Sequence, residues 1–184
     1  MNGNELFPLV DEEGNVTGSA TRAYCHSGAK PLHPVVHLHI FNSAGELYLQ
    51  KRSEHKDIQP GKWDTAVGGH VDFGEEVYQA LFREAREELG VEGFKPVFCF
   101  RYVFESSVER ELVNSFMTIY GGTPSPDLEE VTEGRFWNIA EIRDNIGKGI
   151  FTPNFEAEFG RLQPFIARTG ERPEPKQKDG RHSG

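Results

Sequence analysis

The spacing of apolar residues predicts alternating strands and helices along the chain. Apolar residues recur three and four positions apart over 75–89, which is the period of a helix, and Gly90 ends that segment. Short runs of β-branched and aromatic residues between turn residues are typical of strands. The predicted strands are two short segments within 5–22, then 35–41, 46–52, 64–73, 95–105, 111–120 and 135–138, and further helices are predicted at 139–147 and 153–169.

This order of elements favours a mixed α/β (α+β) domain built around one sheet. We expect a single domain over residues 1–170, in which residues 1–25 form an N-terminal hairpin extension. Residues 171–184 contain no aliphatic or aromatic side chain, so we expect a disordered tail. The polar segments 53–62 and 121–134 are predicted to be loops, and the second of them is acidic.

Composition and charge narrow the class of protein. The 184 residues include 29 Asp and Glu against 20 Lys and Arg, a net charge of −9, which argues against nucleic-acid binding and suits a protein that binds cations. No apolar run is long enough to span a membrane, and the N-terminus lacks the apolar segment of a signal peptide. With two cysteines, we expect a cytoplasmic protein without a disulfide framework.

The predicted helix 75–89 carries three carboxylates beside its apolar stripe. Glu84, Glu87 and Glu88 fall within an arc of about 100° on a helical projection. Like charges at this spacing repel each other, so the arrangement is costly unless a divalent cation binds there. Oxygen ligands of this type suit Mg²⁺ or Mn²⁺. The pattern alone leaves a second interpretation open, a solvated acidic helix face.

The residues around this helix match a longer motif. Gly69 is followed by five residues and Glu75, and seven further residues lead to the run REAREELGV, 83–91. This resembles the Nudix box, G-x5-E-x7-R-E-U-x-E-E-x-G-U with U apolar, at every fixed position, and only Ala85 is small for its place. The resemblance implies the Nudix fold, a mixed β-sheet sandwiched between helices. It also implies hydrolysis of a nucleoside diphosphate linked to another moiety, or of a related diphosphate.

The same resemblance implies roles for individual residues of the box. Glu84, Glu87 and Glu88 would hold the catalytic Mg²⁺ or Mn²⁺, and the carbonyl of Gly68 would add another oxygen ligand. Gly69 would bend the loop where the substrate binds. The bound metal would neutralise diphosphate charge and activate the attacking water.

Residues outside the box complete the predicted active site. In the family a glutamate elsewhere often helps to activate water, and Glu130 and Glu133 are the candidates here, with a solvated acidic loop as the alternative. Lys51, Arg52 and Lys56 are candidates to bind diphosphate oxygens, and the alternative is an exposed basic edge. The partner is predicted to be a small molecule that contains a diphosphate.

A second set of residues has metal-ligand chemistry. His26, His33 and His70 combine with Glu109 and Glu111, which lie on one face of a predicted strand. Their H-x6-H, G-H-x3-G-E and E-x-E patterns together resemble the metal site of type I isopentenyl-diphosphate isomerase, another enzyme of the Nudix fold. We expect the five side chains to converge on one point, and such a site suits Zn²⁺ or Mn²⁺. Whether it is functional or a relic stays open.

The chain departs from that isomerase at decisive positions. The isomerase has a catalytic cysteine where this chain has Gly68, and Asn154 corresponds to its carbocation-stabilising tryptophan, although Tyr102 fits its acid-assisting tyrosine.

We interpret His37 and His39, which alternate on one strand face, as structural. The intact box favours a hydrolase. The alternatives are an isomerase-like protein acting on isoprenoid diphosphates and a non-catalytic binding module. We expect a monomer or a homodimer.

Overall fold

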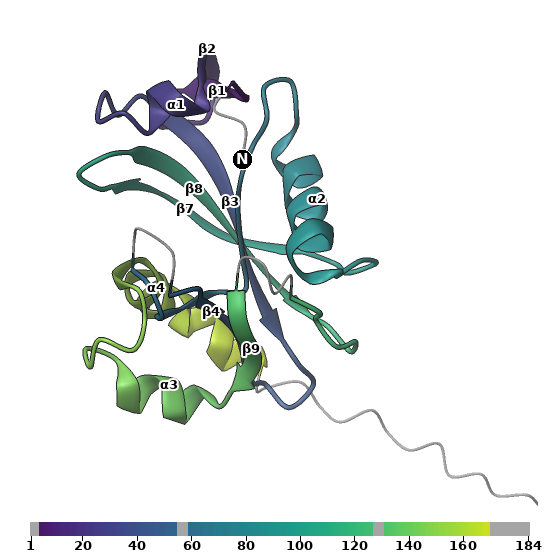
Figure 1. Ribbon diagram of the computed structural model, residues 1–184. Coiled ribbons are helices and arrows are strands. Elements are labelled where there is room, and N and C mark those ends of the chain that lie inside the picture. The colour runs from purple at the N-terminus through teal and green to yellow at the C-terminus, as the bar shows by residue number, and fades with distance from the viewer. Residues whose placement is uncertain (1–3, 55–58, 127–130, 170–184) are drawn as a thin grey trace, which may run out of the picture.

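The computed structural model describes residues 4–54, 59–126 and 131–169. A mixed sheet forms the middle layer, helices cover both of its faces, and a small hairpin crosses one end (Figure 1). The strands are β1 (Leu6–Val10), β2 (Val16–Thr21), β3 (Leu32–Phe41), β4 (Leu47–Arg52), β5 (Trp63–Thr65), β6 (Val67–His70), β7 (Val97–Glu105), β8 (Arg110–Ile119) and β9 (Val131–Trp137). The helices are α1 (Arg22–Cys25), α2 (Val77–Leu89), α3 (Ile139–Asn145) and α4 (Pro153–Thr169).

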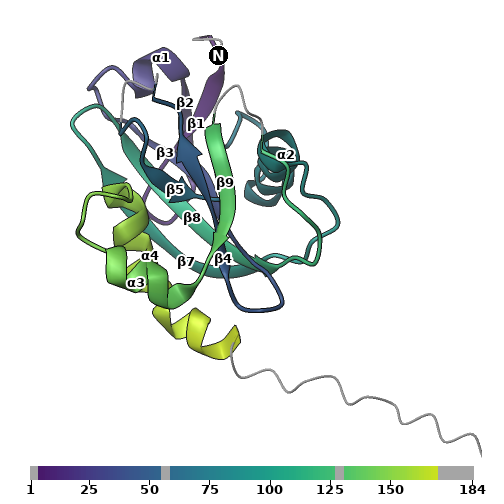
Figure 2. The ribbon, with the colours of Figure 1, turned by 60° about the horizontal axis from the view of Figure 1, so that its bottom comes forward.

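Strand β3 is the centre of the sheet and is buried along its whole length. It pairs in parallel with β8, from Leu32 opposite Arg110 to Phe41 opposite Ile119, and antiparallel with β4 and β6. The order β5-β4-β3-β8-β7 is completed by β6 on β3 and by β9, which runs beside β4 (Figure 2). The predicted mixed sheet between helices is therefore confirmed.

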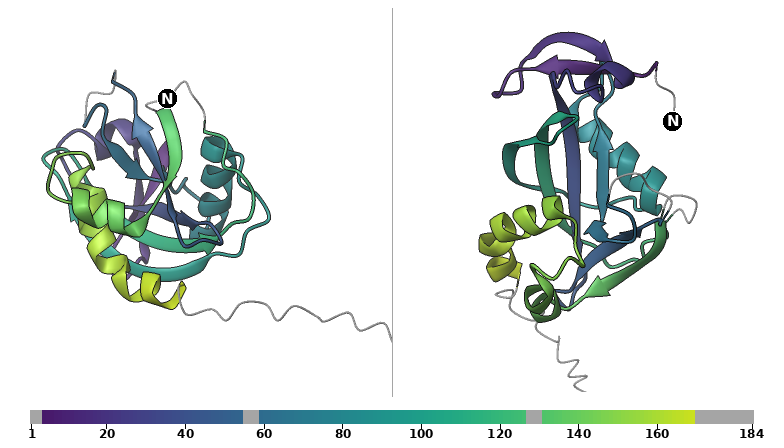
Figure 3. Two further views of the ribbon diagram at one scale, coloured as in Figure 1. Left: turned by 90° about the horizontal axis from the view of Figure 1, so that it is seen from below. Right: turned by 60° about the vertical axis from the view of Figure 1, so that its left-hand side comes forward.

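The two faces of β3 pack against different helices, because successive side chains of a strand point to opposite sides. Figure 3 shows α2 on one side of the sheet and α3 with α4 on the other; we call these sides the α2 face and the α4 face. Val36, Leu38 and Ile40 belong to the core on the α2 face, whereas Phe41 belongs to the core on the α4 face. From the helices, Ala80, Leu81, Ala85 and Leu89 complete the first core, and Ile142, Phe155, Phe159 and Leu162 complete the second.

The helix that carries the box ends where the sequence predicts, at Leu89, and begins at Val77, two residues after the predicted start. The backbone N–H of Glu76 is bound by the side chain of Gln79 at 2.9 Å, which satisfies a donor at the helix start. Gly90 ends α2 in the left-handed conformation, with φ of 60°, where glycine avoids the steric cost of a side chain. The 153–169 helix is also confirmed, with Pro164 inside it.

Some sequence predictions were wrong or incomplete. Residues 131–134 were expected in a loop, but they belong to β9, because pairing with β4 gives their backbone groups partners that no local pattern reveals. The short helix α1 was not predicted, and Thr21 caps it by accepting a hydrogen bond from the N–H of Tyr24. Lys56, Glu130 and the predicted tail at 171–184 lie outside the described residues.

Among the described helices, none combines the length and the apolar character that crossing a membrane requires.

Candidate active site

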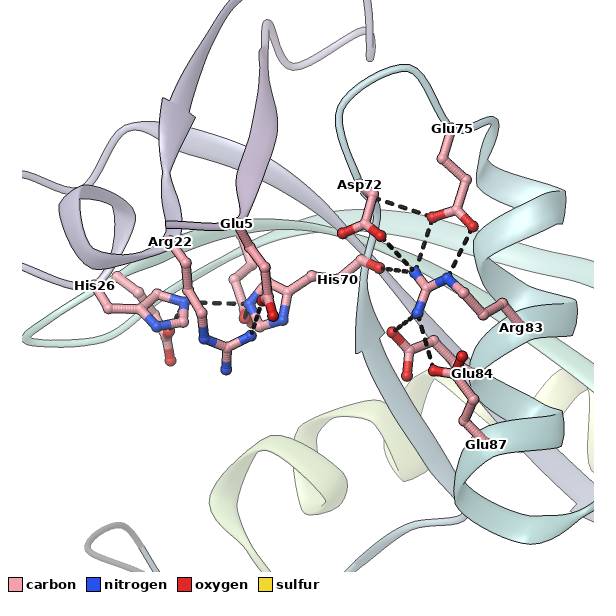
Figure 4. A network of polar contacts seen from close by, with 11 residues as sticks. Glu5, Arg22, His26, His70, Asp72, Glu75, Arg83, Glu84 and Glu87 are labelled. Carbon is pink, nitrogen blue, oxygen red and sulfur yellow. Dashed lines mark hydrogen bonds and ion pairs between the residues drawn. The ribbon is translucent and has the colours of Figure 1, made fainter. Parts of the chain in front are cut away.

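Arg83 joins the loop before α2 to the helix itself. Its guanidinium makes two parallel contacts with Glu75, at 2.9 and 2.8 Å, and also donates to Glu84 at 2.7 Å and to the carbonyl of His70 at 3.0 Å (Figure 4). Burial opposes ionisation of Glu75, but Arg83 and the N–H of Asp72 outweigh it and lower the pKa of this carboxyl. Arg83 thus fixes the end of β6, the loop and α2 in one arrangement.

Glu84 lies directly against the backbone of β6. Gly69 is buried, and a methyl group on its Cα would overlap the carboxyl group of Glu84. Glycine is therefore required here for close approach and not for an unusual backbone angle. Burial raises the pKa of Glu84, although its contact with Arg83 works in the opposite direction.

Replacing Gly69 by alanine is expected to push the Glu84 carboxyl out of its place. Because the obstructing atoms belong to a flexible side chain, we expect a loss of only about 1 kcal/mol in the free energy of unfolding, and a loss of catalytic rate of about tenfold or more. Thermal unfolding and a steady-state assay measure the two effects. Gly68→Ala is the matched control for stability, because a methyl group there meets only His37, at 3.5 Å. Native catalytic rate in Gly69→Ala would contradict the placement of Glu84.

The other two box carboxylates point to different neighbours. Glu88 accepts a hydrogen bond at 3.1 Å from Gln50, a buried residue of β4 that also donates to the carbonyl of Ala66. Glu87 is half exposed and accepts from Arg83 at 3.3 Å. The carboxylates thus lie along one side of α2 and offer hard oxygen ligands of the kind that Mg²⁺ and Mn²⁺ prefer.

The three predicted histidine ligands meet at one point. His26, His33 and His70 each offer a ring nitrogen, and these atoms lie within 4.8 Å of one another; we call these residues the histidine trio. Nδ1 of His33 lies 3.0 Å from the carbonyl of Pro31, so this nitrogen carries the proton and Nε2 presents a lone pair. That Nε2 is buried and has no hydrogen-bond partner among the described residues. Such an atom is a candidate metal ligand.

Glu109 and Glu111 lie beside the trio. An oxygen of Glu109 is 3.3 Å from Nε2 of His26, and an oxygen of Glu111 is 4.0 Å from Nε2 of His70. Glu111 comes into place because β8 runs parallel to β3, with Glu111 opposite His33. Burial and the negative charge of Glu109 raise the pKa of Glu111 to about 7.

Burial also determines the charge state of the trio. It lowers the pKa of His26, His33 and His70, and the positive charge of Arg22 adds to this effect. Neutral imidazoles next to carboxylates form a donor set that fits Zn²⁺ or Mn²⁺. The five residues named from the sequence are therefore close together and have suitable chemistry.

The N-terminal hairpin covers the trio, which the sequence did not indicate. The ring of Phe7, on β1, stacks on His70 with a centroid distance of 4.4 Å and an angle of 6°, and on His33 at 5.7 Å and 19°. Phe7 is buried, and the carbonyl of Leu6 next to it accepts a hydrogen bond from the N–H of Phe73. Phe7 looks like an ordinary strand residue in the sequence, since the alternating pattern gives no sign of what its ring touches.

His70 belongs to both groups of residues. Its ring lies in the trio, whereas its carbonyl binds Arg83 of the box (Figure 4). The box carboxylates and the trio are therefore connected through one residue at the end of β6.

The remaining predicted residues lie on other elements: Lys51 and Arg52 on β4, Glu133 on β9, Tyr102 on β7 and Asn154 on α4. Lys51 is opposite Glu133 of β9, and Arg52 contacts Asp64 at 3.4 Å. The hydroxyl of Tyr102 donates to Asn154 at 2.9 Å, so the two positions compared with the isomerase touch each other.

Comparison with known proteins identifies the family. A sequence model of the NUDIX domain matches residues 31–155. An isopentenyl-diphosphate Delta-isomerase of Mycolicibacterium vanbaalenii is 36% identical over 70% of this chain and 75% of that protein, and an uncharacterized Nudix hydrolase of Streptomyces coelicolor is 29% identical over 91% and 93%. The crystal structure of DR0079 from Deinococcus radiodurans superimposes with a TM-score of 0.69 and 26% identity, covering 90% of this chain and 99% of that one. The chain belongs to the Nudix family.

Proposed function

We propose that this protein is a metal-dependent pyrophosphohydrolase. Its substrate is a nucleoside diphosphate linked to another moiety, or a related diphosphate, and its cofactor is Mg²⁺ or Mn²⁺. The observation that carries this proposal is the intact box on α2, in which Arg83 fixes the loop and Glu84 packs against Gly69. A relative named as a Nudix hydrolase that aligns over most of the chain supports it.

The predicted site residues divide into metal ligands, phosphate-binding residues and a general base. Glu84, Glu87 and Glu88, with the carbonyl of Gly68, hold the metal, which when bound neutralises diphosphate charge and lowers the pKa of water. Lys51 and Arg52, together with Lys56 outside the described residues, bind phosphate oxygens. The general base is proposed to be Glu133, on β9, or Glu130, outside the described residues.

The trio and its two glutamates form a proposed second metal site, for Zn²⁺ or Mn²⁺. Their convergence also favours a second candidate function, isomerisation of isoprenoid diphosphates, because relatives with that name align over most of the chain. This reaction needs an acid–base pair across an apolar group. The resemblance to the isomerase places its catalytic cysteine at residue 68. This chain has a glycine there, which offers no side chain for proton transfer, so we favour hydrolysis.

A product assay separates the two functions. Native protein with Mg²⁺ or Mn²⁺ is incubated with nucleotide-linked and isoprenoid diphosphates, and phosphate, nucleotide and dimethylallyl diphosphate are measured. We expect hydrolysis products and no conversion of isopentenyl diphosphate. We also expect no isomerisation by Gly68→Cys, since Asn154 stands where the isomerase has its aromatic residue. Dimethylallyl diphosphate above the no-enzyme control would establish the isomerase instead, and no product from any substrate would favour a binding module.

A further inference from the structure

One buried phenylalanine of the N-terminal hairpin lies against histidines and not in an apolar core. Phe7, on β1, keeps only 1% of its surface exposed, yet none of the apolar clusters among the described residues contains it. Its ring lies against the histidine trio, with centroid distances of 4.4 Å to His70, 5.7 Å to His33 and 6.2 Å to His26. Packing of the apolar core therefore does not explain why this ring is placed here.

The ring of Phe7 is nearly parallel to two of the three imidazoles. The angle between the ring planes is 6° for His70 and 19° for His33, and these two imidazoles are stacked on each other at 14° with a centroid distance of 5.5 Å. His26, by contrast, is tilted by 52° to the phenylalanine ring. Rotation of the His70 or His33 ring out of its present plane would therefore lose the stacking contact with Phe7.

The two stacked imidazoles differ in what else holds them. The torsion that rotates an imidazole is broad, so a histidine ligand normally has a partner at its second nitrogen that fixes the ring. His33 has such a partner, since its Nδ1 lies 3.0 Å from the carbonyl of Pro31. Among the described residues, the ring of His70 makes polar contacts only at Nε2, with His26 at 3.2 Å and Glu111 at 4.0 Å. Stacking on Phe7 is thus the contact that fixes the plane of His70.

Phe7 is itself anchored by contacts that do not involve the trio. The carbonyl of Leu6 accepts a hydrogen bond at 2.8 Å from the N–H of Phe73, in the loop before α2, and the carbonyl of Glu5 accepts one at 2.8 Å from the N–H of Arg22. The guanidinium of Arg22 also lies 5.8 Å from the centre of the Phe7 ring. The ring is therefore held in place independently of any bound metal, and such preorganisation favours binding.

We propose that Phe7 is the positioning residue of the second metal site, whose ring holds His70 in the orientation that binds the metal and excludes water from that side of the trio. This inference rests on the second metal site of the proposed function and goes beyond it, because it assigns part of the affinity to a residue that is not a ligand. Residues that orient metal ligands typically change metal affinity by about 10- to 100-fold, and an apolar group beside a site limits the access of solvent.

The test measures the zinc affinity of full-length Phe7→Leu. Leucine keeps an apolar side chain but has no flat ring to stack on His70. Zn²⁺ is titrated in competition with a chromogenic chelator, with excess Mg²⁺ present to occupy the box carboxylates. We expect the affinity to fall about tenfold or more. If circular dichroism shows that Phe7→Leu is poorly folded, Phe7→Met gives the same comparison, because methionine fills irregular space in a buried site without a planar ring.

Cobalt gives a separate measure of the geometry. The visible absorption of bound Co²⁺ depends on the number and arrangement of its ligands. At saturating Co²⁺, we expect the spectrum of Phe7→Leu to differ from that of the native protein, because the plane of His70 is no longer fixed and water reaches the metal. A loss of fold stability alone would not change the spectrum of the saturated protein.

Val10→Ala is the matched control, because Val10 is a buried residue of the same strand that packs with Leu32 and Leu112. We expect its zinc affinity to stay within about twofold of native and its cobalt spectrum to be unchanged. Equal losses of affinity in Phe7→Leu and Val10→Ala would mean that the hairpin only has to be docked, and would overturn the inference. Native affinity and a native spectrum in Phe7→Leu would also overturn it but would leave the metal site in place. No zinc binding by the native protein would refute both, whereas the product assay decides the proposed hydrolysis separately.

Discussion

Replacing Glu88 by glutamine is expected to abolish diphosphate hydrolysis while the fold persists. Glutamine has the same shape and can still accept the hydrogen bond that Gln50 donates at 3.1 Å, so α2 keeps its contact with β4. The change removes one negative charge from the proposed metal ligands. A loss of this kind at a reacting centre costs about 10³-fold in catalytic rate. Steady-state hydrolysis with Mg²⁺ measures it, and circular dichroism checks the fold.

The control for this prediction is another glutamate near α2. Glu92 follows the helix, is exposed, and is not part of the proposed site, so Glu92→Gln is expected to retain native activity. Glu84→Gln and Glu87→Gln are expected to be nearly as damaging as Glu88→Gln. Their effects should not add in the double variants, because all three residues serve one metal cluster. A folded and fully active Glu88→Gln protein would refute the assignment of the box.

The sequence was most informative where a local pattern and a motif coincide. The period of the apolar residues and Gly90 define α2, and the spacing from Gly69 to Glu88 places the carboxylates on it. These features depend on residues that are close together in the sequence, so a local pattern is enough to predict them. By contrast, Glu133 was assigned to a loop, because the pairing of β9 with β4 joins segments far apart in the chain.

The packing of α4 over His37 and His39 was also not predicted, although one residue of this helix indicates a buried polar contact. Glu158 lies among Phe155, Phe159 and Leu162, at the spacing of one helix face, so a charged residue is placed on an apolar stripe. A glutamate in that position is expected to have a buried partner. His37 and His39 were interpreted as structural, and nothing in the sequence indicates that α4 covers them, because strand-to-helix packing depends on the complete fold.

Replacing His33 by leucine is expected to eliminate metal binding at the trio without weakening the metal-free fold. Nε2 of His33 is buried and unpaired among the described residues, which costs about 1–3 kcal/mol in the free energy of unfolding. Leucine removes that cost, and the hydrogen bond lost to the carbonyl of Pro31 is worth about 1 kcal/mol. The metal-free variant should therefore be at least as stable as the native protein.

Added metal should make the native protein more stable than His33→Leu. A ligand that binds only the folded state at about one hundred times its dissociation constant stabilises it by about 2.7 kcal/mol. Zn²⁺ or Mn²⁺ should therefore raise the melting temperature of the native protein but not that of His33→Leu, and Co²⁺ should give its absorption spectrum only with the native trio. His39→Gln, on the same strand, is the control that should still respond. The same metal response in His33→Leu as in the native protein would refute the site, and no response in the native protein would show that the trio is a relic.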